Sequence, residues 1–386
     1  DKLKLQLTSI HFDLIVIGGG ITGSGVCLDA VARGMKVCLI EMNDFASGTS
    51  SKSTKLIHGG LRYLEQFKFN LVHETGSERA VLNRLAPSIV KSEKMLLPIK
   101  NNGKLNKLST SIALSIYDYL AEVRIKDKKQ ILSKKEISHY EPDINGSIGL
   151  RIDSTGIIDA HGLMNSFYQK SIASNHDYLF QSTIVDCEPT QNGYQLTTKS
   201  PADDLEKVTC EWVINAAGLN SDIISNMIIP ENSTPDLIFS KGFYFSLASH
   251  WRNRFNHLIY PMPDKDQRSL GIHLSFDQTG SVKLGPDAHF LPDRTEDYSM
   301  DESLLIHFFE EASKYIVGIE IEDLTPNFSG IRPKIKTVDY SFADYYIAHE
   351  KENGFPGWIN LIGIESPGLT SAIAIGEEIA RWVNDS

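Results

Sequence analysis

The chain has 386 residues, of which 41% are hydrophobic and 9% aromatic, enough to bury a larger core than one ordinary domain requires. Its net charge of −11, without a long basic run, argues against nucleic acid as a partner, because phosphate neutralisation needs clustered Lys and Arg. No apolar run reaches the ~18 residues of a membrane-spanning helix, and the start DKLKLQLTSIHFD is too polar for a secretory signal.

The first elements of the chain predict a βαβ unit. Residues 12–17, FDLIVI, are a short apolar run that ends at three glycines, which predicts a buried parallel strand. A helix is expected over 20–33, because apolar residues recur there at near-helical spacing and Gly34 supplies the stop. Residues 36–40, KVCLI, predict the second strand.

A glycine-rich turn joins the first strand to the helix. Residues 18–23, GGGITG, match the dinucleotide-binding pattern GxGxxG, and Glu41 follows the second strand. We expect Gly18 to allow a tight turn, Gly20 to let the backbone approach a pyrophosphate, and Gly23 to allow close packing of helix on strand. Glu41 would bind both ribose hydroxyls and repel a 2′-phosphate, which favours FAD or NAD over NADP. The alternative is a structural turn in another kind of α/β protein.

The middle of the chain predicts a second structural unit. Residues 70–95 have the pattern of an amphipathic helix, and 101–140 combine a basic, Asn-rich loop with a helix around 111–123. A further helix is expected over 162–174.

The second half is mainly β-structure. Residues 180–189 and 194–199 predict a hairpin, since an Asn-Gly turn lies between them. Residues 211–215 predict a buried strand that runs into a turn of small residues, and the alternation over 236–290 predicts an antiparallel sheet. The last elements are the strand INLIGI, the turn ESPG and a helix over 369–383.

The four cysteines lie far apart, in no CxxC or Cys/His ligand spacing. We therefore expect free thiols in a reducing compartment and no metal site. With no membrane span in the sequence, this predicts a cytoplasmic chain, in solution or peripheral on the inner membrane surface. The chain begins without Met, which leaves a removed targeting segment open.

A hydroxyl-rich loop follows the second strand. Residues 44–65, DFASGTSSKSTKLIHGGLRYLE, resemble the flavin-approaching segment of the FAD-dependent glycerol-3-phosphate dehydrogenases, and the likeness continues through 69–89. The resemblance implies FAD as the cofactor, with His58, Gly59 and Gly60 beside the isoalloxazine. The residues that it implies around the ribose and pyrophosphate are Asn43, Ser47, Gly48, Thr49, Ser50 and Ser51.

The second half of the chain resembles a different group of flavoproteins. HLIYPMP, SLGIHLSFDQTGSVKLGPDA, SGIRPKI and LIGIESPGLTSAIAIGEEIA are similar to stretches of L-2-hydroxyglutarate dehydrogenases and their relatives among the D-amino-acid-oxidase-like flavoproteins. The glycerol-phosphate enzymes are expected to carry a Gly-Gly-Lys-Leu-Thr-Thr stretch near this C-terminal site and a helical domain after it, and neither is found in this sequence. The two resemblances agree on fold and cofactor and differ on substrate.

The expected fold class is α/β, with two domains built from discontinuous segments. A Rossmann-like FAD-binding domain is predicted over 10–85, 145–235 and 325–386. A mixed antiparallel-sheet domain, which would cap the substrate, is predicted over 86–144 and 236–324.

Further cofactor contacts are expected late in the chain. Ile184 would meet adenine through its backbone, and Ala216, Ala217 and Gly218 would let the chain pass close to the cofactor. The N-terminus of the last helix would face the flavin O2 edge and stabilise negative charge there, or be an ordinary N-cap. The remaining expected contacts are Ile21, Thr22, Met42, Arg332, Gly363, Ser366, Pro367, Gly368, Leu369 and Thr370.

Two histidines and one arginine are the candidates for catalysis. His58 would orient the substrate, take a hydroxyl proton or carry a covalent flavin link, unless it is an ordinary structural histidine. His273 lies in the alternating sheet and points either at substrate or at the outer face. Arg332 has a planar fork that suits a carboxylate, and the oxidase-like resemblance makes it the anion clamp; the alternative is a surface ion pair. Further candidate substrate contacts are Arg62, Tyr63, Lys241 and Tyr260.

The expected reaction is oxidation of a small anionic secondary alcohol by hydride transfer to flavin N5, with a quinone or another electron acceptor. A 2-hydroxy acid such as L-2-hydroxyglutarate is the first expectation, because the C-terminal half should form most of the substrate wall. Glycerol 3-phosphate is the alternative, followed by an amino acid or amine. A non-enzymatic alternative is an FAD-binding regulatory protein on the same fold. The sequence leaves the oligomeric state and a covalent flavin link open.

Overall fold

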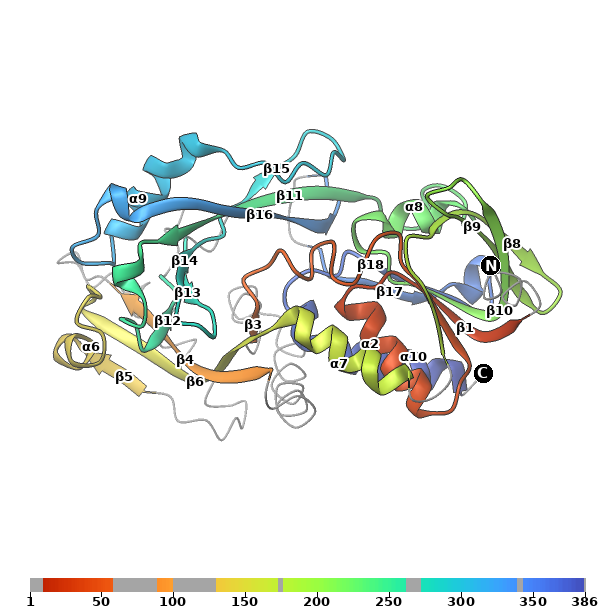
Figure 1. Ribbon diagram of the computed structural model, residues 1–386, viewed down its shortest axis with the longest axis horizontal. Helices are drawn as coiled ribbons and strands as arrows, with labels where there is room; N and C mark the ends of the chain where they lie inside the picture. The colour runs from red at the N-terminus through yellow and green to blue at the C-terminus, as the bar shows by residue number, and fades with distance from the viewer. Residues whose placement is uncertain are drawn as a thin grey trace.

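The computed structural model of the chain forms two β-sheets that lie along its long axis, one toward each end (Figure 1). The long strands β11 (Leu237–Leu247) and β16 (Leu324–Ile335) run from the second sheet toward the first (Figure 1). The structure describes residues 10–57, 89–99, 130–172, 176–261, 272–338 and 343–384.

The first sheet has eight strands, with the order β17-β18-β10-β1-β2-β7 and the β8–β9 hairpin joined to β10. Four of these strands are parallel to one another: β18, β10, β1 and β2. Their carboxyl ends therefore lie at the same edge of the sheet. The strands are β1 (His11–Ile17), β2 (Val37–Ile40), β7 (Asp177–Leu179), β8 (Thr183–Thr190), β9 (Gly193–Lys199), β10 (Leu205–Asn215), β17 (Tyr346–His349) and β18 (Trp358–Ile362).

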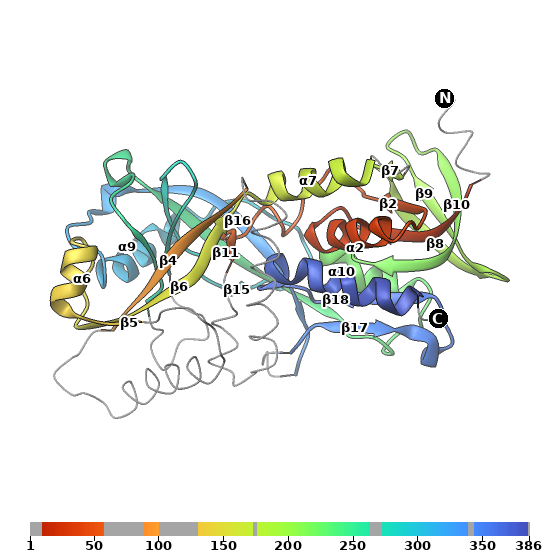
Figure 2. The same ribbon diagram turned by 90° about the horizontal axis from the view of Figure 1, so that it is seen from below.

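Three helices cover one face of this sheet: α2 (Ile21–Ala32), α7 (Ala160–Ile172) and α10 (Gly368–Asn384) (Figures 1 and 2). On β1, Leu14 and Val16 pack in the cluster that includes α2 and α10, while Ile15 and Ile17 pack in the cluster on the side of β8 and β9. Burial on both faces explains the unbroken apolar run of this strand. The short helix α8 (Ser221–Asn226) follows β10.

The second sheet has ten strands, in the order β15-β11-β14-β13-β12-β4-β6-β3, with β16 paired to β11 and β5 paired to β6. Most pairs are antiparallel, and β12 runs parallel to β4. The helices α6 (Lys134–Tyr140) and α9 (Leu305–Ser313) accompany this sheet. Its other strands are β3 (Leu56–Ile57), β4 (Val90–Ile99), β5 (Gln130–Ser133), β6 (Ile148–Ile158), β12 (His257–Ile259), β13 (Leu274–Phe276), β14 (Val282–Leu284) and β15 (His289–Phe290).

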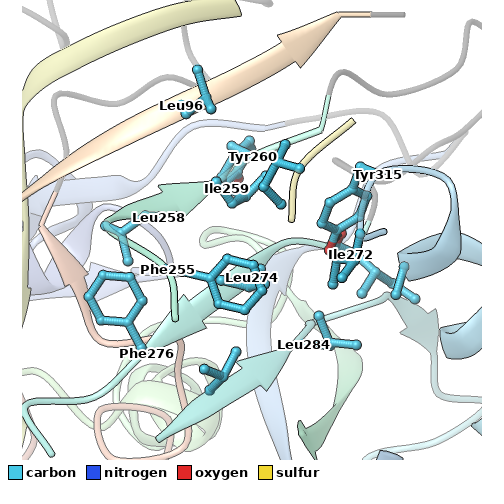
Figure 3. Close-up of a cluster of buried hydrophobic side chains, with 14 of the residues drawn as sticks. Leu96, Phe255, Leu258, Ile259, Tyr260, Ile272, Leu274, Phe276, Leu284 and Tyr315 are labelled. Carbon is cyan, nitrogen blue, oxygen red and sulfur yellow. Dashed lines mark hydrogen bonds between the residues drawn. The ribbon is translucent and has the colours of Figure 1, made fainter. Parts of the chain in front are cut away.

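The core of the second unit is a cluster of buried apolar side chains from these strands. Figure 3 shows Leu258, Leu274 and Phe276 with their neighbours from β4 and β14. The Tyr315 hydroxyl donates to the carbonyl of Ile272 over 3.0 Å, which satisfies a buried polar group.

Short 3₁₀ helices occupy Gly218–Asn220, Ser249–Trp251, Glu302–Leu304, Ile321–Asp323 and Glu350–Asn353.

The predicted βαβ unit, the 180–199 hairpin, the antiparallel sheet and the last strand and helix are all present. The predicted helix over 70–95 is wrong at its end, because Val90–Ile99 is a strand that pairs with both β6 and β12. Residues 70–88 and the predicted helix at 111–123 lie outside the described residues. The four cysteines are free and buried, as expected.

The domain boundaries predicted at 145 and 325 place β6 and β16 with the FAD-binding segments, whereas both strands pair within the second sheet. No strand was predicted over 148–158 from the sequence. We propose that the two-domain division follows the two sheets, with both strands in the cap. Among the described helices, none is long and apolar enough to cross a membrane.

Candidate functional site

A cavity of about 1040 Å³ lies where the carboxyl ends of the first sheet meet β11 and β16 of the second. Its lining comes from the turns after β1, β2, β10 and β18, from the 47–56 loop, and from β11 and β16. This volume is at the upper end for small-molecule sites. The parallel topology therefore brings together segments that are far apart in the sequence.

The glycine-rich turn has the tight geometry expected of it. Gly18 has φ +111°, and a Cβ there would lie 2.4 Å from the carbonyl oxygen of Ala216. A Cβ at Gly23 would lie 2.0 Å from the carbonyl oxygen of Gly18, so the helix packs directly on the turn. A Cβ at Gly20 would approach only the Ser50 hydroxyl, at 3.2 Å. Gly18 and Gly20 both line the cavity, and their bare backbone leaves room for a pyrophosphate.

Glu41 is held in place by backbone donors. Its carboxylate accepts from the N–H of Gly19 over 2.6 Å and from the N–H of Asn43 over 2.8 Å, and the side chain is 7% exposed. A carboxylate has about four lone-pair sites, so two bonds leave capacity for further donors. The group lines the cavity and fits the expected contact with a ribose.

The hydroxyl-rich loop connects the two sheets. The Ser50 hydroxyl accepts from the N–H of Ile21 at the start of α2, over 3.0 Å. The Thr49 hydroxyl donates to the carbonyl of Ile331 in β16, over 2.6 Å. The residues of this loop and its approach that line the cavity are Met42, Asn43, Ser47, Gly48, Thr49 and Ser50. Ser51 is not among the described lining residues, since its hydroxyl turns to the carbonyl of Gly48.

Most of the later cofactor candidates reach the cavity. The lining includes Ile21, Thr22, Ile184, Ala216, Ala217, Gly218, Gly363, Ser366, Pro367, Gly368 and Leu369. At the start of α10, the N–H of Gly368 donates to the carbonyl of Glu365 and that of Thr370 donates to the carbonyl of Pro367. These two amides are therefore already bonded, and a ligand in the cavity would also face the positive end of the helix dipole. Thr370 is buried and is not part of the described lining.

Arg332 lies at the end of the cavity formed by the second sheet. One of its Nη atoms donates to the carbonyl of Asp287 over 2.7 Å. The Asp287 carboxylate accepts from the N–H of Phe243 over 2.7 Å and lies 2.7 Å from Nε2 of His289, whose pKa is raised by this bond. A Cβ at Gly242 would lie 2.7 Å from the Arg332 Nη2 atom, so a glycine gives the guanidinium its space.

His273 and Tyr260 lie together on the cavity wall. Their rings stack with centroids 4.1 Å apart and planes 16° apart, and both residues are under a tenth exposed. Of the two orientations left open by the strand alternation, His273 has the one that faces the cavity. The stack fixes the imidazole plane.

The structure does not bring Lys241 to the described lining of the cavity. Its ammonium bonds to Asp297 over 2.9 Å and lies over the ring of Phe243. The reason is the period of two along β11, because Ser240, Gly242 and Tyr244 line the cavity and Lys241 faces the other way. The bond from Lys241 is the main cause that lowers the pKa of Asp297.

The candidates His58, Gly59, Gly60, Arg62 and Tyr63 lie outside the described residues. Sequence reasoning missed Gly242, Tyr244 and Asp287, which surround Arg332 or share its wall. The alternation along β11 could have predicted that Gly242 and Tyr244 share one face of the strand. No pattern in the sequence points to Asp287.

The residues present fit FAD. The Glu41 end offers a carboxylate for ribose, the middle offers bare glycines and the start of α2 for phosphates, and the far end is walled by aromatic and cationic side chains. The helices α2 and α10 approach so closely that a Cβ at Gly25 would lie 2.5 Å from the Ala372 carbonyl oxygen. The starts of both helices lie at the cavity, where Ile21 and Gly368 are part of the lining.

Comparisons with known proteins also indicate an FAD-binding protein. The model of the family described as FAD dependent oxidoreductase matches residues 13–382. Aerobic glycerol-3-phosphate dehydrogenase of Staphylococcus aureus strain USA300 is 54% identical over 346 residues, covering 87% of this chain and 60% of that protein. In strain MRSA252 the match is 54% over 142 residues, 37% of this chain. The chain thus spans about 60% of the length of the relatives with the longer match.

Two solved structures show the same fold. L-alpha-glycerophosphate oxidase from Mycoplasma pneumoniae, with FAD bound, has a TM-score of 0.79 at 19% identity and covers 97% of this chain and 95% of its own. Glycerol-3-phosphate dehydrogenase from Bacillus halodurans, complexed with FAD, has a TM-score of 0.74 at 24% identity and covers 100% and 66%. The α/β fold class and FAD as the cofactor are therefore confirmed. Because the family match extends from the first strand of the βαβ unit into the last helix, the chain belongs to the FAD-dependent oxidoreductases of the D-amino-acid-oxidase type.

Proposed function

We propose that the chain oxidises glycerol 3-phosphate at its secondary hydroxyl, giving dihydroxyacetone phosphate. The observation that carries this proposal is the 54% identity to aerobic glycerol-3-phosphate dehydrogenase over 87% of the chain. It reverses the order expected from sequence motifs, in which a 2-hydroxy acid stood first. The expected order rested partly on the absence of a helical domain after the C-terminal site. Because the chain spans only about 60% of the length of these relatives, that absence does not distinguish between the two substrates.

The side chains at the far end of the cavity support an anionic substrate. Arg332 presents several N–H donors in a fixed plane, which suits two oxygens of a phosphate. Its bond to the Asp287 carbonyl fixes the direction of the fork. An imidazole nitrogen of His273 would take the hydroxyl proton, with the ring held by Tyr260. FAD, when bound, supplies the hydride acceptor at N5 and passes the electrons on, in this proposal to a quinone.

A 2-hydroxy acid is kept as the second candidate for a specific reason. His273, Arg332 and Ser366 come from the stretches that resemble L-2-hydroxyglutarate dehydrogenases, and all three line the cavity. A carboxylate suits the arginine fork as well as a phosphate does.

Anaerobic mixing of the FAD-loaded protein with each compound tests the proposal through the flavin band at about 450 nm, a property of the cofactor. We expect glycerol 3-phosphate to bleach the band, and uncharged glycerol to leave it unchanged. Bleaching by L-2-hydroxyglutarate alone would replace the proposal by its second candidate. A yellow protein that no compound bleaches, amino acids included, would favour a regulatory FAD-binding protein. Reoxidation by a soluble quinone faster than by oxygen would support the acceptor.

Gly242→Ala tests how Arg332 is placed. The added Cβ would lie 2.7 Å from the guanidinium Nη2 atom and 2.8 Å from a carbon of Pro286. Overpacking of this kind costs about 1–3 kcal/mol, so we expect the KM for glycerol 3-phosphate to rise about 10-fold or more with FAD retained. Gly149→Ala is the matched control, because its Cβ would meet Leu96 at 2.7 Å in the same sheet, away from the cavity lining. An equal effect of both changes on KM would contradict the assignment.

A further inference from the structure

A second cavity, of about 400 Å³, lies at the second sheet, where α6 meets the neighbouring strands β12, β4 and β6 (Figure 1). Its volume is within the range of small-molecule sites. None of its described lining residues also lines the cavity that fits FAD. The described lining consists of Ser92, Glu93, Lys94, His139, Tyr140, Arg151, Asn256 and His257. The second cavity is therefore a separate site, and no step of the proposed function uses it.

A buried carboxylate–imidazole pair lies at the wall of the second cavity. Nδ1 of His257 lies 2.6 Å from Oε1 of Glu141, and the same oxygen accepts from the N–H of Asn256 over 2.8 Å. Glu141 is fully buried, and His257, which belongs to the lining, is 3% exposed. Because a carboxylate oxygen accepts hydrogen bonds, the ring proton belongs on Nδ1. Nε2 of His257 is then the ring atom that is left for another group.

The outer atoms of this pair have no partner. Within the part of the chain that the structure describes, Nε2 of His257 and Oε2 of Glu141 are buried and make no hydrogen bond. Buried polar groups are normally bonded, so an unbonded ring nitrogen on a residue that lines a cavity points to a ligand. Burial raises the pKa of Glu141, and the bond with His257 opposes that rise. An anion at Nε2 would accept the second ring proton and stabilise the charged form of the pair.

Arg151 brings a largely buried cation to the same wall. Its side chain is 10% exposed, and its Nε donates to the Asp153 carboxylate over 3.0 Å. The guanidinium lies 5.4 Å from the centre of the Tyr140 ring, and that ring meets the His257 ring edge to face with centroids 6.1 Å apart. A guanidinium has five N–H donors, so the contact with Asp153 leaves donors for a ligand.

Lys94 adds a second positive charge. It is exposed, and it is the register partner of His257 in the parallel β4–β12 pair. The one carboxylate in the described lining is that of Glu93, and it already lies 2.6 Å from the ammonium of Lys91, which is outside this lining. The lining therefore offers two cations to a ligand, while its one carboxylate is paired elsewhere.

We propose that the second cavity binds a small carboxylic acid in its ionised form, with Arg151 and Lys94 pairing with the carboxylate and Nε2 of His257 donating to it. A planar carboxylate matches two donors of a guanidinium, which favours it over other anions here. The Tyr140 ring gives the carbon chain of the acid a non-polar wall. The inference does not rest on glycerol 3-phosphate as the substrate.

NMR of the FAD-loaded protein with isotope-labelled histidine, titrated with succinate, tests the site. The ring signal of His257 is assigned from its loss in His257→Gln. We expect this signal to move and saturate with succinate, because Nε2 gains a charged hydrogen bond. Succinamide, the uncharged diamide, should leave it in place. Binding in the other cavity is followed separately, through the signal of His273.

Two variants and a matched control test the cations. Arg151→Met should weaken succinate binding at His257 about 10-fold or more, and Arg151→Lys should weaken it less, because one charge remains. Lys94→Met should weaken it about 2- to 5-fold, because an exposed charge is screened by water. Lys94 is exposed, so this variant tests the site even if Arg151→Met fails to fold. Lys135→Met, which removes an exposed lysine of α6 outside the described lining, should leave the affinity unchanged.

The outcomes are distinct from those that test the substrate. A His257 signal that does not move with succinate would overturn the inference, as would a wild-type affinity in both Arg151→Met and Lys94→Met. Movement with inorganic phosphate but not with succinate would overturn the assignment to a carboxylic acid. None of these results depends on whether glycerol 3-phosphate bleaches the flavin, so either proposal can fail alone.

Discussion

Gly18→Ala is expected to yield a protein that retains no FAD after gel filtration. The Cβ would lie 2.4 Å from the carbonyl oxygen of Ala216, and φ +111° is strained for alanine. The two turns that meet here, after β1 and after β10, must move apart. We expect a loss of about 2–5 kcal/mol in the free energy of unfolding, from the backbone cost and the overpacking together. The measurements are the absorbance at about 450 nm per protein and the thermal unfolding temperature.

Two glycines supply the controls. Gly34 also has a positive φ, +85°, but no atom lies within 4 Å of its Cβ position, so Gly34→Ala should lose some stability and keep FAD. Gly20 has φ −75°, which alanine adopts freely, and its Cβ would stand in the path proposed for the pyrophosphate. Gly20→Ala should therefore unfold near the wild-type temperature and bind FAD about 10- to 100-fold more weakly. Wild-type FAD affinity in Gly20→Ala would show that the cofactor does not pass over this residue.

Arg332→Met is expected to lower kcat/KM for glycerol 3-phosphate by about 30- to 5,000-fold while FAD stays bound. Truncating one partner of a hydrogen-bonded charge pair in a closed site costs about 2–5 kcal/mol. Both kcat and KM should change, because the fork binds the anion and also directs the hydroxyl-bearing carbon. Steady-state kinetics with a soluble quinone as acceptor measure both values.

Further variants separate the effect of the Arg332 charge from the effect of its planar shape. Arg332→Lys keeps one positive charge and loses the planar fork, so its activity should lie between those of wild type and Arg332→Met. Arg254→Met removes an arginine that is paired with Asp143 outside the described cavity lining, and should leave kcat/KM within twofold. If Arg332→Met kept more than a tenth of the wild-type kcat/KM, the proposed role of Arg332 would be wrong.

The adenosine end of the site could be predicted because its signals are local. A strand that ends in glycines, a helix, and an acid after the next strand are all read within residues 12–41, and the structure has each of them. The hydroxyl-rich loop was also found, but its anchors were not. Thr49 bonds to Ile331 and Thr54 contacts Tyr244, and such pairs form only when the second sheet is in place.

The far end of the cavity was harder to predict because alternation along a strand shows which residues share a face, not which face is inward. The sequence favoured Lys241 over its neighbours Gly242 and Tyr244, which line the cavity. Asp287 holds Arg332 through a backbone carbonyl, a contact that no residue pattern reveals. The strand at Val90–Ile99 was read as helix at its start, because its pairing partners lie far away in the sequence.

We propose as the central claim that this chain removes a hydride from carbon 2 of glycerol 3-phosphate. Anaerobic stopped-flow mixing of the FAD-loaded protein with glycerol 3-phosphate deuterated at carbon 2 tests it most directly. We expect the flavin band to bleach in one phase at saturating substrate, and more slowly with the deuterated compound, while deuterium at carbons 1 and 3 leaves the rate unchanged. The absence of bleaching, or bleaching that slows only with deuterium at carbon 1 or 3, would contradict the claim.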